Sequence, residues 1–188
     1  MRLFRGIPAR SDQPVALTIG NFDGVHLGHQ AMVERLLAAA RARGLPAAVM
    51  TFEPHPREFF APDQAPARLT ALRDKAERLR ALGVDRLYVC RFDAAFSSQA
   101  PEAFVRDVLG HRLDVRWLLV GDDFRFGAKR AGDLELLQRM AAGTGMTVES
   151  MHTVSVGGRR ASSTAVREAL AAGDLPAAAE LLGRPYGI

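Results

Sequence analysis

Residues 17–30, which read Leu-Thr-Ile-Gly-Asn-Phe-Asp-Gly-Val-His-Leu-Gly-His-Gln, constrain the fold more than any other stretch of the chain. The apolar run over residues 15–19 predicts a buried parallel strand, and helix-period apolar spacing over residues 31–43 predicts a helix. A turn that contains Gly20 and Gly24 connects the two. Because unpaired N–H groups and the positive end of a helix dipole meet at such a turn, the stretch predicts a phosphate site.

Two histidines mark the end of this turn. His26 and His29 are three positions apart, so their imidazoles are expected to project toward one spot, which Gly28 keeps open. Imidazole donors beside a helix N-terminus suit the phosphates of a nucleotide, on which negative charge grows as pyrophosphate leaves. Either histidine alone would more often be a cap or a surface residue, so this interpretation rests on the pair. The ordinary P-loop and dinucleotide-binding glycine motifs are absent from the sequence.

Strands and helices alternate along the rest of the chain. Apolar runs predict strands over residues 47–52, 87–92, 117–121 and 146–154, with a possible edge strand at residues 3–7. Helix-period spacing and capping residues predict helices over residues 70–82, 101–109, 133–140 and 163–170, then one more short helix. Prolines predict an irregular flap over residues 59–68. This alternation predicts an α/β fold with a mostly parallel sheet and helices on both faces.

Three further loops carry polar or rigid residues. Pro54 and Pro56 interrupt the chain after the second long strand and enforce an extended path. Asp122 and Asp123 follow a later strand, where such acids either bind a cation or order the turn. Residues 160–167 supply hydroxyls and arginines at another helix N-terminus, which is again suited to phosphate.

Composition narrows the class of protein. The 188 residues, 48% of them hydrophobic, predict a single domain, and the lone Cys90 lies in an apolar run where a structural thiol is expected. No apolar run of about 18 residues and no secretory signal layout occur, so we expect a cytoplasmic protein without a membrane segment. The net charge of +4 fits a nucleic acid or a small anion. Because basic residues are scattered among acids, we expect small-molecule substrates and no nucleic-acid partner.

The four loops together resemble the FMN adenylyltransferase module of the bacterial bifunctional FAD synthetases, in the nucleotidylyltransferase superfamily. The resemblance covers nearly the whole chain. It is carried by residues 20–29, 51–56, 120–127 and 161–167. The first and last segments are typical of the superfamily, whereas the middle two indicate a flavin. One departure is Ala161, where the family usually has Ile or Val.

This resemblance implies a Rossmann-like fold and the transfer of AMP from ATP to FMN, giving FAD and pyrophosphate with Mg²⁺ as cofactor. It implies catalytic roles for His26, His29, Ser163, Thr164 and Arg167. It places ATP against Gly20, Asn21, Phe22, Asp23, Gly24, Gly28 and Arg160. It places the flavin against Phe52, Pro54, Pro56, Asp123 and Phe126, although Phe124 or Phe126 could equally be core residues. No residue of the chain is assigned as a metal ligand.

The family also sets an expectation for domain organisation. Residues 1–183 are expected to form the adenylyltransferase domain, and residues 184–188 to begin the connection to a riboflavin kinase module. The kinase signature Pro-Thr-Ala-Asn is not in this sequence, so no riboflavin kinase activity is expected from the chain. Two alternatives stay open: a nucleotidylyltransferase with a different phosphate acceptor, and a non-catalytic binder of flavin or nucleotide.

Overall fold

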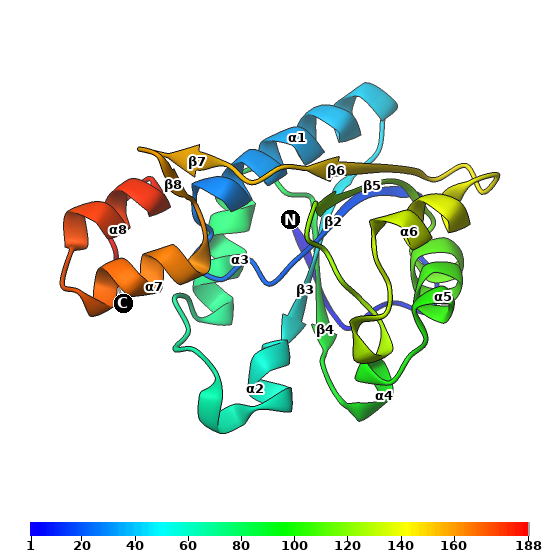
Figure 1. The fold of residues 1–188 in the computed structure, drawn as a ribbon. Coiled ribbons are helices and arrows are strands. Elements are labelled where there is room, and N and C mark those ends of the chain that lie inside the picture. The colour runs from blue at the N-terminus through cyan, green and yellow to red at the C-terminus, as the bar shows by residue number, and fades with distance from the viewer. Residues whose placement is uncertain (188) are drawn as a thin grey trace.

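Six parallel strands form the sheet at the centre of the molecule (Figure 1). The computed structural model describes residues 1–187. The strands lie in the order β1-β4-β3-β2-β5-β6. Their bounds are β1 Arg2–Arg5, β2 Val15–Ile19, β3 Ala47–Glu53, β4 Arg86–Arg91, β5 Val115–Gly121 and β6 Thr147–Met151. From β2 the chain builds the sheet toward β3 and β4, and β5 then pairs with the other side of β2. The strand order therefore reverses between β2 and β5, where open α/β sheets bind ligands at the carboxyl edge.

Helices cover both faces of this sheet (Figure 1). The α-helices are α1 Leu27–Arg43, α2 Pro56–Phe60, α3 Leu72–Ala81, α4 Ala94–Ser97, α5 Pro101–Ala103, α6 Leu134–Ala141, α7 Ser163–Ala171 and α8 Leu175–Leu182. A π-helix continues α5 over Phe104–Arg112, and short 3₁₀ turns lie at Pro62–Gln64 and Ala128–Arg130. The last two helices of the chain, α7 and α8, pack against each other beside the start of α1.

Alternating strand residues divide the core between the two faces. Leu17 and Met50 belong to the cluster that packs under α6 and the π-helix. Ala16 and Val49 belong to the cluster that packs under α1 and α3. Because side chains on a strand alternate in direction, both faces are apolar along β2 and β3, as a parallel sheet covered on both sides requires. The expected α/β fold is confirmed.

Several element boundaries differ from the sequence-based expectation. The helix expected to begin at residue 31 begins at Leu27, because His26 caps it. The last long strand ends at Met151, and the chain then forms an unexpected hairpin of β7, Ser155–Val156, and β8, Arg159–Arg160. Gly157 and Gly158, with φ of 55° and 78°, form its turn, and such a Gly-Gly pair is a hairpin signal. The flap expected to be irregular over residues 59–68 includes the end of α2, which His55 caps, and a 3₁₀ turn.

Cys90 lies inside β4 and is fully buried. Burial raises the pKa of its thiol to about 12, so the side chain stays protonated and inert, as expected for a structural cysteine. Across residues 1–187, no helix combines the length and the apolar character that crossing a membrane would need.

Candidate functional site

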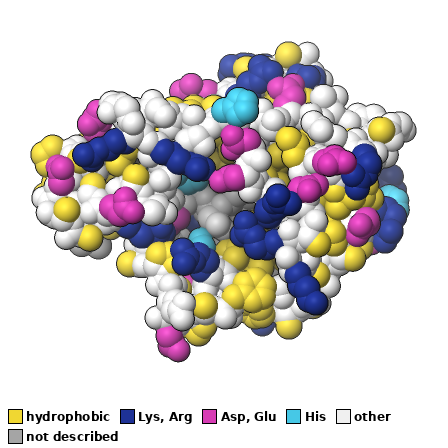
Figure 2. All heavy atoms as spheres, viewed as in Figure 1, with side chains coloured by type: hydrophobic (Ala, Val, Ile, Leu, Met, Phe, Trp, Pro, Cys, Tyr) yellow, Lys and Arg dark blue, Asp and Glu magenta, His cyan; other side chains and the backbone are white. Residues whose placement is uncertain are grey.

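The carboxyl edge of the sheet is hollowed where β2 and β5 end, and basic, acidic and histidine side chains border the hollow (Figure 2). A cavity of about 200 Å³ lies there, between the start of α1, the loop after β5, the segment after β6 and the segment before α7. It brings together His26, Gly28, His29, Asp123 and Arg160 from the residues singled out in the sequence. These residues are far apart in the chain, and the strand reversal at β2 and β5 is what assembles them.

The two histidines stack face to face at the start of α1. Their ring centroids are 3.6 Å apart, with 23° between the ring planes, so the expectation that both imidazoles meet at one spot is confirmed. His26 Nδ1 accepts the backbone N–H of His29 at 3.3 Å and thereby caps the helix. When His26 is neutral, its remaining proton is therefore on Nε2, which is left as a donor.

Burial keeps both imidazoles uncharged. It lowers the pKa of His26 to about 4, while the nearby carboxylate of Asp23 opposes this shift. The pKa of His29 is lowered well below its ordinary value by burial first, and then by the charges of His26 and Lys75. Both rings are therefore neutral at physiological pH. The site thus offers neutral N–H donors and helix N–H groups, and the phosphate that the sequence predicts here stays a prediction.

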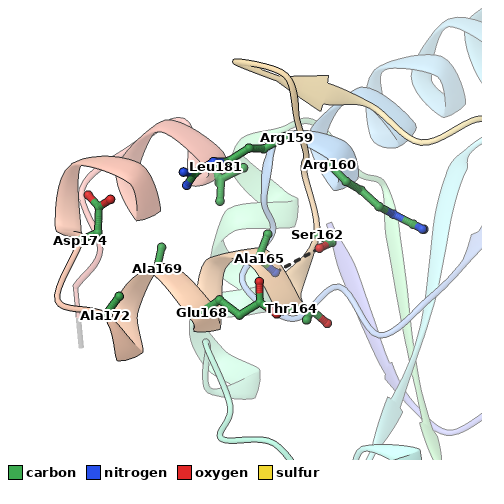
Figure 3. A pocket seen from close by; sticks show the side chains of 10 residues that line it. All are labelled: Arg159, Arg160, Ser162, Thr164, Ala165, Glu168, Ala169, Ala172, Asp174 and Leu181. Carbon is green, nitrogen blue, oxygen red and sulfur yellow. Dashed lines mark hydrogen bonds between the residues drawn. The ribbon is translucent and has the colours of Figure 1, made fainter.

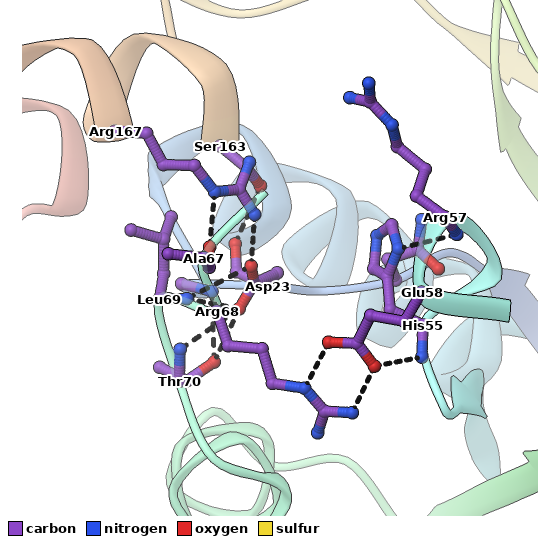
Figure 4. Close-up of polar contacts among 12 residues, drawn as sticks. Asp23, His55, Arg57, Glu58, Ala67, Arg68, Leu69, Thr70, Ser163 and Arg167 are labelled. Atoms are coloured by element: carbon purple, nitrogen blue, oxygen red, sulfur yellow. Dashed lines mark hydrogen bonds and ion pairs between the residues drawn. The ribbon is translucent and has the colours of Figure 1, made fainter. Parts of the chain in front are cut away.

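Asp23 connects the phosphate turn to two other segments (Figure 4). Its buried carboxylate accepts the backbone N–H groups of Leu69 and Thr70, each at 3.0 Å, and the guanidinium of Arg167. Ser163 donates its hydroxyl to the backbone oxygen of Asp23 at 2.8 Å. The turn, the flap and the start of α7 are therefore held together around one carboxylate.

Ser163 and Arg167 thus lie at the turn, but they are occupied by protein groups. Arg167 Nε donates to the backbone oxygen of Ala67 at 2.6 Å in addition to its pair with Asp23. Thr164 is exposed and lines a different cavity of about 580 Å³ between β8, α7 and α8 (Figure 3). Ser162, which the sequence analysis did not select, lines both cavities and caps α7 by accepting the N–H of Ala165 at 3.1 Å. Its position before the helix was the available signal.

An aromatic patch lies at the end of β3, beside the loop that contains Pro54 and Pro56. Phe52 packs against Phe92 and Phe96, with both centroid distances 5.7 Å. Phe59 and Phe60 of α2 pack edge-on against Phe92, each at 5.6 Å, and Phe60 is 67% exposed. The sequence analysis did not find Phe59, Phe60 or Phe92, because their relation to the loop depends on how α2 folds back over the strand ends.

The loop after β5 has some side chains on the surface and others in the core. Asp123 is exposed and pairs with Arg160 at 3.0 Å, and Asp122 pairs with His152 at 3.0 Å. Phe126 is 8% exposed and packs on Phe104 and Phe124 at centroid distances of 5.7 and 5.6 Å. Phe126 is thus a core residue on the α6 side of the sheet, and its contact with a flavin stays a prediction.

Two charged groups near the turn also escaped the sequence analysis. Arg68 closes the flap onto the end of β3 by donating to Glu53 at 2.5 Å and to Glu58 at 2.6 Å, and this pairing lowers the pKa of Glu58 (Figure 4 shows the Glu58 contacts). Lys75 of α3 is buried and donates to Thr51 Oγ1 at 3.4 Å, and burial lowers the pKa of its ammonium. Arg68 and Lys75 each contact residues of another element, which only the fold brings close to them.

Comparison with known proteins decides the family. The model of the FAD synthetase family matches residues 9–165, which include the turn, both histidines, the proline loop, Ser163 and Thr164. The chain belongs to the FAD synthetase family. A bifunctional riboflavin kinase/FMN adenylyltransferase of Escherichia coli K12 is 50% identical over 191 residues, and one of Haemophilus influenzae is 46% identical over 190. Each alignment covers 100% of this chain.

The chain matches only part of the length of those relatives in the FAD synthetase family. The chain spans 61% of the Escherichia coli protein and 62% of the Haemophilus influenzae protein. A solved structure described as a macrolide-efflux protein from Streptococcus pneumoniae superposes with a TM-score of 0.85 at 26% identity, over 98% of this chain and 61% of that one. The likeness in fold therefore extends over the chain almost from end to end.

Gly28 provides a first test of the site. An added Cβ would lie 2.8 Å from the backbone oxygen of Ala161 and 3.2 Å from atoms of the His26 ring. Although Ala normally stabilises a helix relative to Gly, we expect Gly28→Ala to lower the free energy of unfolding by about 1–3 kcal/mol through overpacking. Thermal unfolding measures this loss. Gly110→Ala, whose Cβ would meet only Val105 O at 3.5 Å, is the control; equal behaviour of the two variants would contradict this account.

The histidine pKa values predict the pH dependence of stability. His26 has a folded pKa of about 4, below the value of about 6.5 in an unfolded chain, so the unfolded state binds protons first as pH falls. The stability that neutral burial provides is complete above pH 6.5 and is lost as the pH falls toward 4. We expect His26→Asn, which retains a capping side chain, to lose less stability over this interval. If the free energies of unfolding of the unaltered chain and of His26→Asn fell equally with pH, this explanation would be refuted.

Phe126 allows a test of whether its ring stabilises the hydrophobic core in the absence of a ligand. Phe126→Ala should destabilise the fold by about 3–5 kcal/mol, because it removes a ring packed on Phe104 and Phe124. Phe126→Leu should cost less, since it keeps most of the apolar volume. Urea unfolding of the substrate-free chain measures the difference. A loss below about 1 kcal/mol for the alanine variant would remove Phe126 from the core.

Proposed function

We propose that this chain is an FMN adenylyltransferase, which transfers AMP from ATP to FMN and releases FAD and pyrophosphate. The family supports this, and so do the relatives, which are named for this activity together with riboflavin kinase. The observation that carries the proposal is the stacked, neutral histidine pair at the N-terminus of α1, beside the point where the strand order reverses. Such a site is suited to a polyphosphate and needs no protein nucleophile.

In the proposed reaction a phosphate oxygen of FMN forms a bond to the α-phosphorus of ATP, and the bond from that phosphorus to the bridging oxygen breaks. The pyrophosphate that leaves takes up the negative charge. We assign His26 and His29 to donate to its oxygens, beside the backbone N–H groups at the start of α1. Because these donors are already held in a buried site, they stabilise the developing charge without reorganising.

Arg160, Ser163, Thr164 and Arg167 complete the proposed ATP site. Arg160 lines the cavity beside the histidines. Ser163 and Arg167 adjoin the turn through Asp23. Thr164 lies in the first turn of α7, next to Ser163, and lines the cavity between β8, α7 and α8.

Mg²⁺ is proposed as the cofactor and would neutralise charge on the phosphates. Among residues 1–187 no three metal-binding side chains cluster. Asp122 and Asp123 are near the cavity, but each is paired with a cationic or ionisable partner. This donor set fits an ion that retains waters and is held mainly by substrate phosphates.

For the flavin we propose the slot formed by Phe52, Pro54 and Pro56, extended by the exposed ring of Phe60. An isoalloxazine is flat and largely apolar, so rigid prolines and aromatic rings suit it. Asp123 would accept from the imide N–H of the ring once it is released from Arg160. Phe126 would support this loop from the core side.

The shorter length of the chain bears on the second activity of its relatives. We propose that residues 1–183 are the adenylyltransferase domain and that residues 184–188 begin the connection to a riboflavin kinase module. The reaction would take place in the cytoplasm, where ATP is available.

The purified chain with ATP, Mg²⁺ and FMN should form FAD, followed by chromatography, and it should form no FMN from riboflavin. His29→Ala should lower kcat by about 10²–10³, because it removes a donor to the leaving group. His111→Ala, at an exposed imidazole on the π-helix, is the control and should retain activity.

Three outcomes would change the assignment. FMN formed from riboflavin would contradict the domain division. Adenylylation of another phosphate acceptor in preference to FMN would support the alternative nucleotidylyltransferase. Binding of ATP and FMN without FAD formation would indicate a non-catalytic binder.

A further inference from the structure

Immediately after α8 the chain returns to the back of the phosphate turn. Gly183 ends α8 with φ of 70°, and an added Cβ there would lie 2.7 Å from Leu27 Cδ2 of α1. This close approach places Arg184 beside the turn. Its Nη2 donates to Gly24 O at 2.6 Å, and its Nη1 lies 3.1 Å from Leu182 O and 3.4 Å from Val25 O.

A second side chain holds the same carbonyls. Gln30 Nε2, from the first turns of α1, donates to Val25 O and Leu182 O, both at 2.9 Å. Arg184 and Gln30 therefore fix two consecutive backbone oxygens of the turn, those of Gly24 and Val25, and join them to the end of α8.

The turn needs such support because its backbone is strained. Phe22 and Val25 have φ of 51° and 42°, a region that side chains other than glycine rarely adopt and that is least favourable for a β-branched residue. In a trans peptide the N–H points away from the carbonyl, so fixing the oxygen of Val25 also fixes the N–H of His26. The direction of the helix start, and with it the histidine pair, depends on these two oxygens.

Arg184 also brings a charge to the turn. Burial, followed by the charge of Arg78 on α3, lowers the pKa of its guanidinium. Within residues 1–187 it forms no ion pair, so its charge adds to the positive potential behind the turn. The groups that face it are backbone oxygens and a second arginine.

We infer that Arg184 is a positioning residue for the phosphate turn, acting through the carbonyls of Gly24 and Val25 to keep His26 and His29 in place for a polyphosphate. Its kinetic consequence rests on the proposed function, whereas its effect on the turn does not. The residue lies outside the segment matched by the family model and outside the motifs that indicated the site.

The test compares Arg184→Gln, Arg184→Lys and Gln30→Met with Arg78→Gln. The last is the matched control, since it removes the same charge from a neighbouring arginine that, within residues 1–187, forms no hydrogen bond or ion pair with the turn. Hydrogen exchange of peptides covering residues 20–30 is measured without substrates. We expect faster exchange in Arg184→Gln and Gln30→Met, partial protection in Arg184→Lys, and exchange as in the unaltered chain for Arg78→Gln.

Steady-state kinetics of FAD formation supply the second measurement. A displaced histidine pair should lower kcat by about 10- to 100-fold in Arg184→Gln, with a smaller change in the KM for ATP and partial recovery in Arg184→Lys. Unaltered exchange and kcat would overturn the inference. So would equal losses in Arg78→Gln, or a lower melting temperature with unaltered kcat per folded molecule. If the unaltered chain makes no FAD, the proposed function fails and the exchange data alone decide the role of Arg184.

Discussion

The carboxylate of Asp23 is the contact on which the arrangement of the site depends. It is 4% exposed, and it accepts hydrogen bonds from Leu69 and Thr70, directly after the flap, and from Arg167 on α7. Burying a carboxylate is unfavourable unless its oxygens are satisfied, and here three partners satisfy them. Since those partners come from different segments, loss of this one group would leave two backbone donors unpaired and would deprive the partly buried guanidinium of its counter-charge. The arrangement of the site therefore follows from the need of this one buried carboxylate for hydrogen-bond partners.

The histidine pair shows the same dependence on burial. Stacked imidazoles would repel one another if both were charged, and the low dielectric around them disfavours even one charge. The fold thus presents neutral donors at the positive end of a helix. A bound polyphosphate would supply the missing negative charge and raise the affinity of both rings for protons. Binding and protonation are consequently coupled at this site, whereas in the free protein the rings stay neutral.

The sequence predicted those parts of the structure that depend on neighbouring residues. The strand, turn and helix over residues 15–43 and the cap of α6 at Asp133 follow from local periodicity and capping, and the structure confirms them. The partners of Asp23 at Thr70 and Arg167 are 47 and 144 residues away, and Arg184 is 160 residues from Gly24. No local pattern encodes such pairs. The same reason explains why the aromatic patch around Phe92 and the flap closure by Arg68 were not found.

The contacts of Arg167 are compatible with its proposed contact with a phosphate. A guanidinium carries five N–H donors in a planar fork. In this structure Nε serves Ala67 O and Nη2 serves Asp23, so the fork is oriented by protein groups on one edge while donors on its remaining edge are not committed to these two partners. An arginine held in this way can meet a phosphate without releasing the carboxylate that aims it. A lysine would lack this fixed orientation, because its ammonium is a compact charge at the end of a flexible stem. Asp23 therefore fixes the direction in which Arg167 can act, in addition to joining the flap to α7.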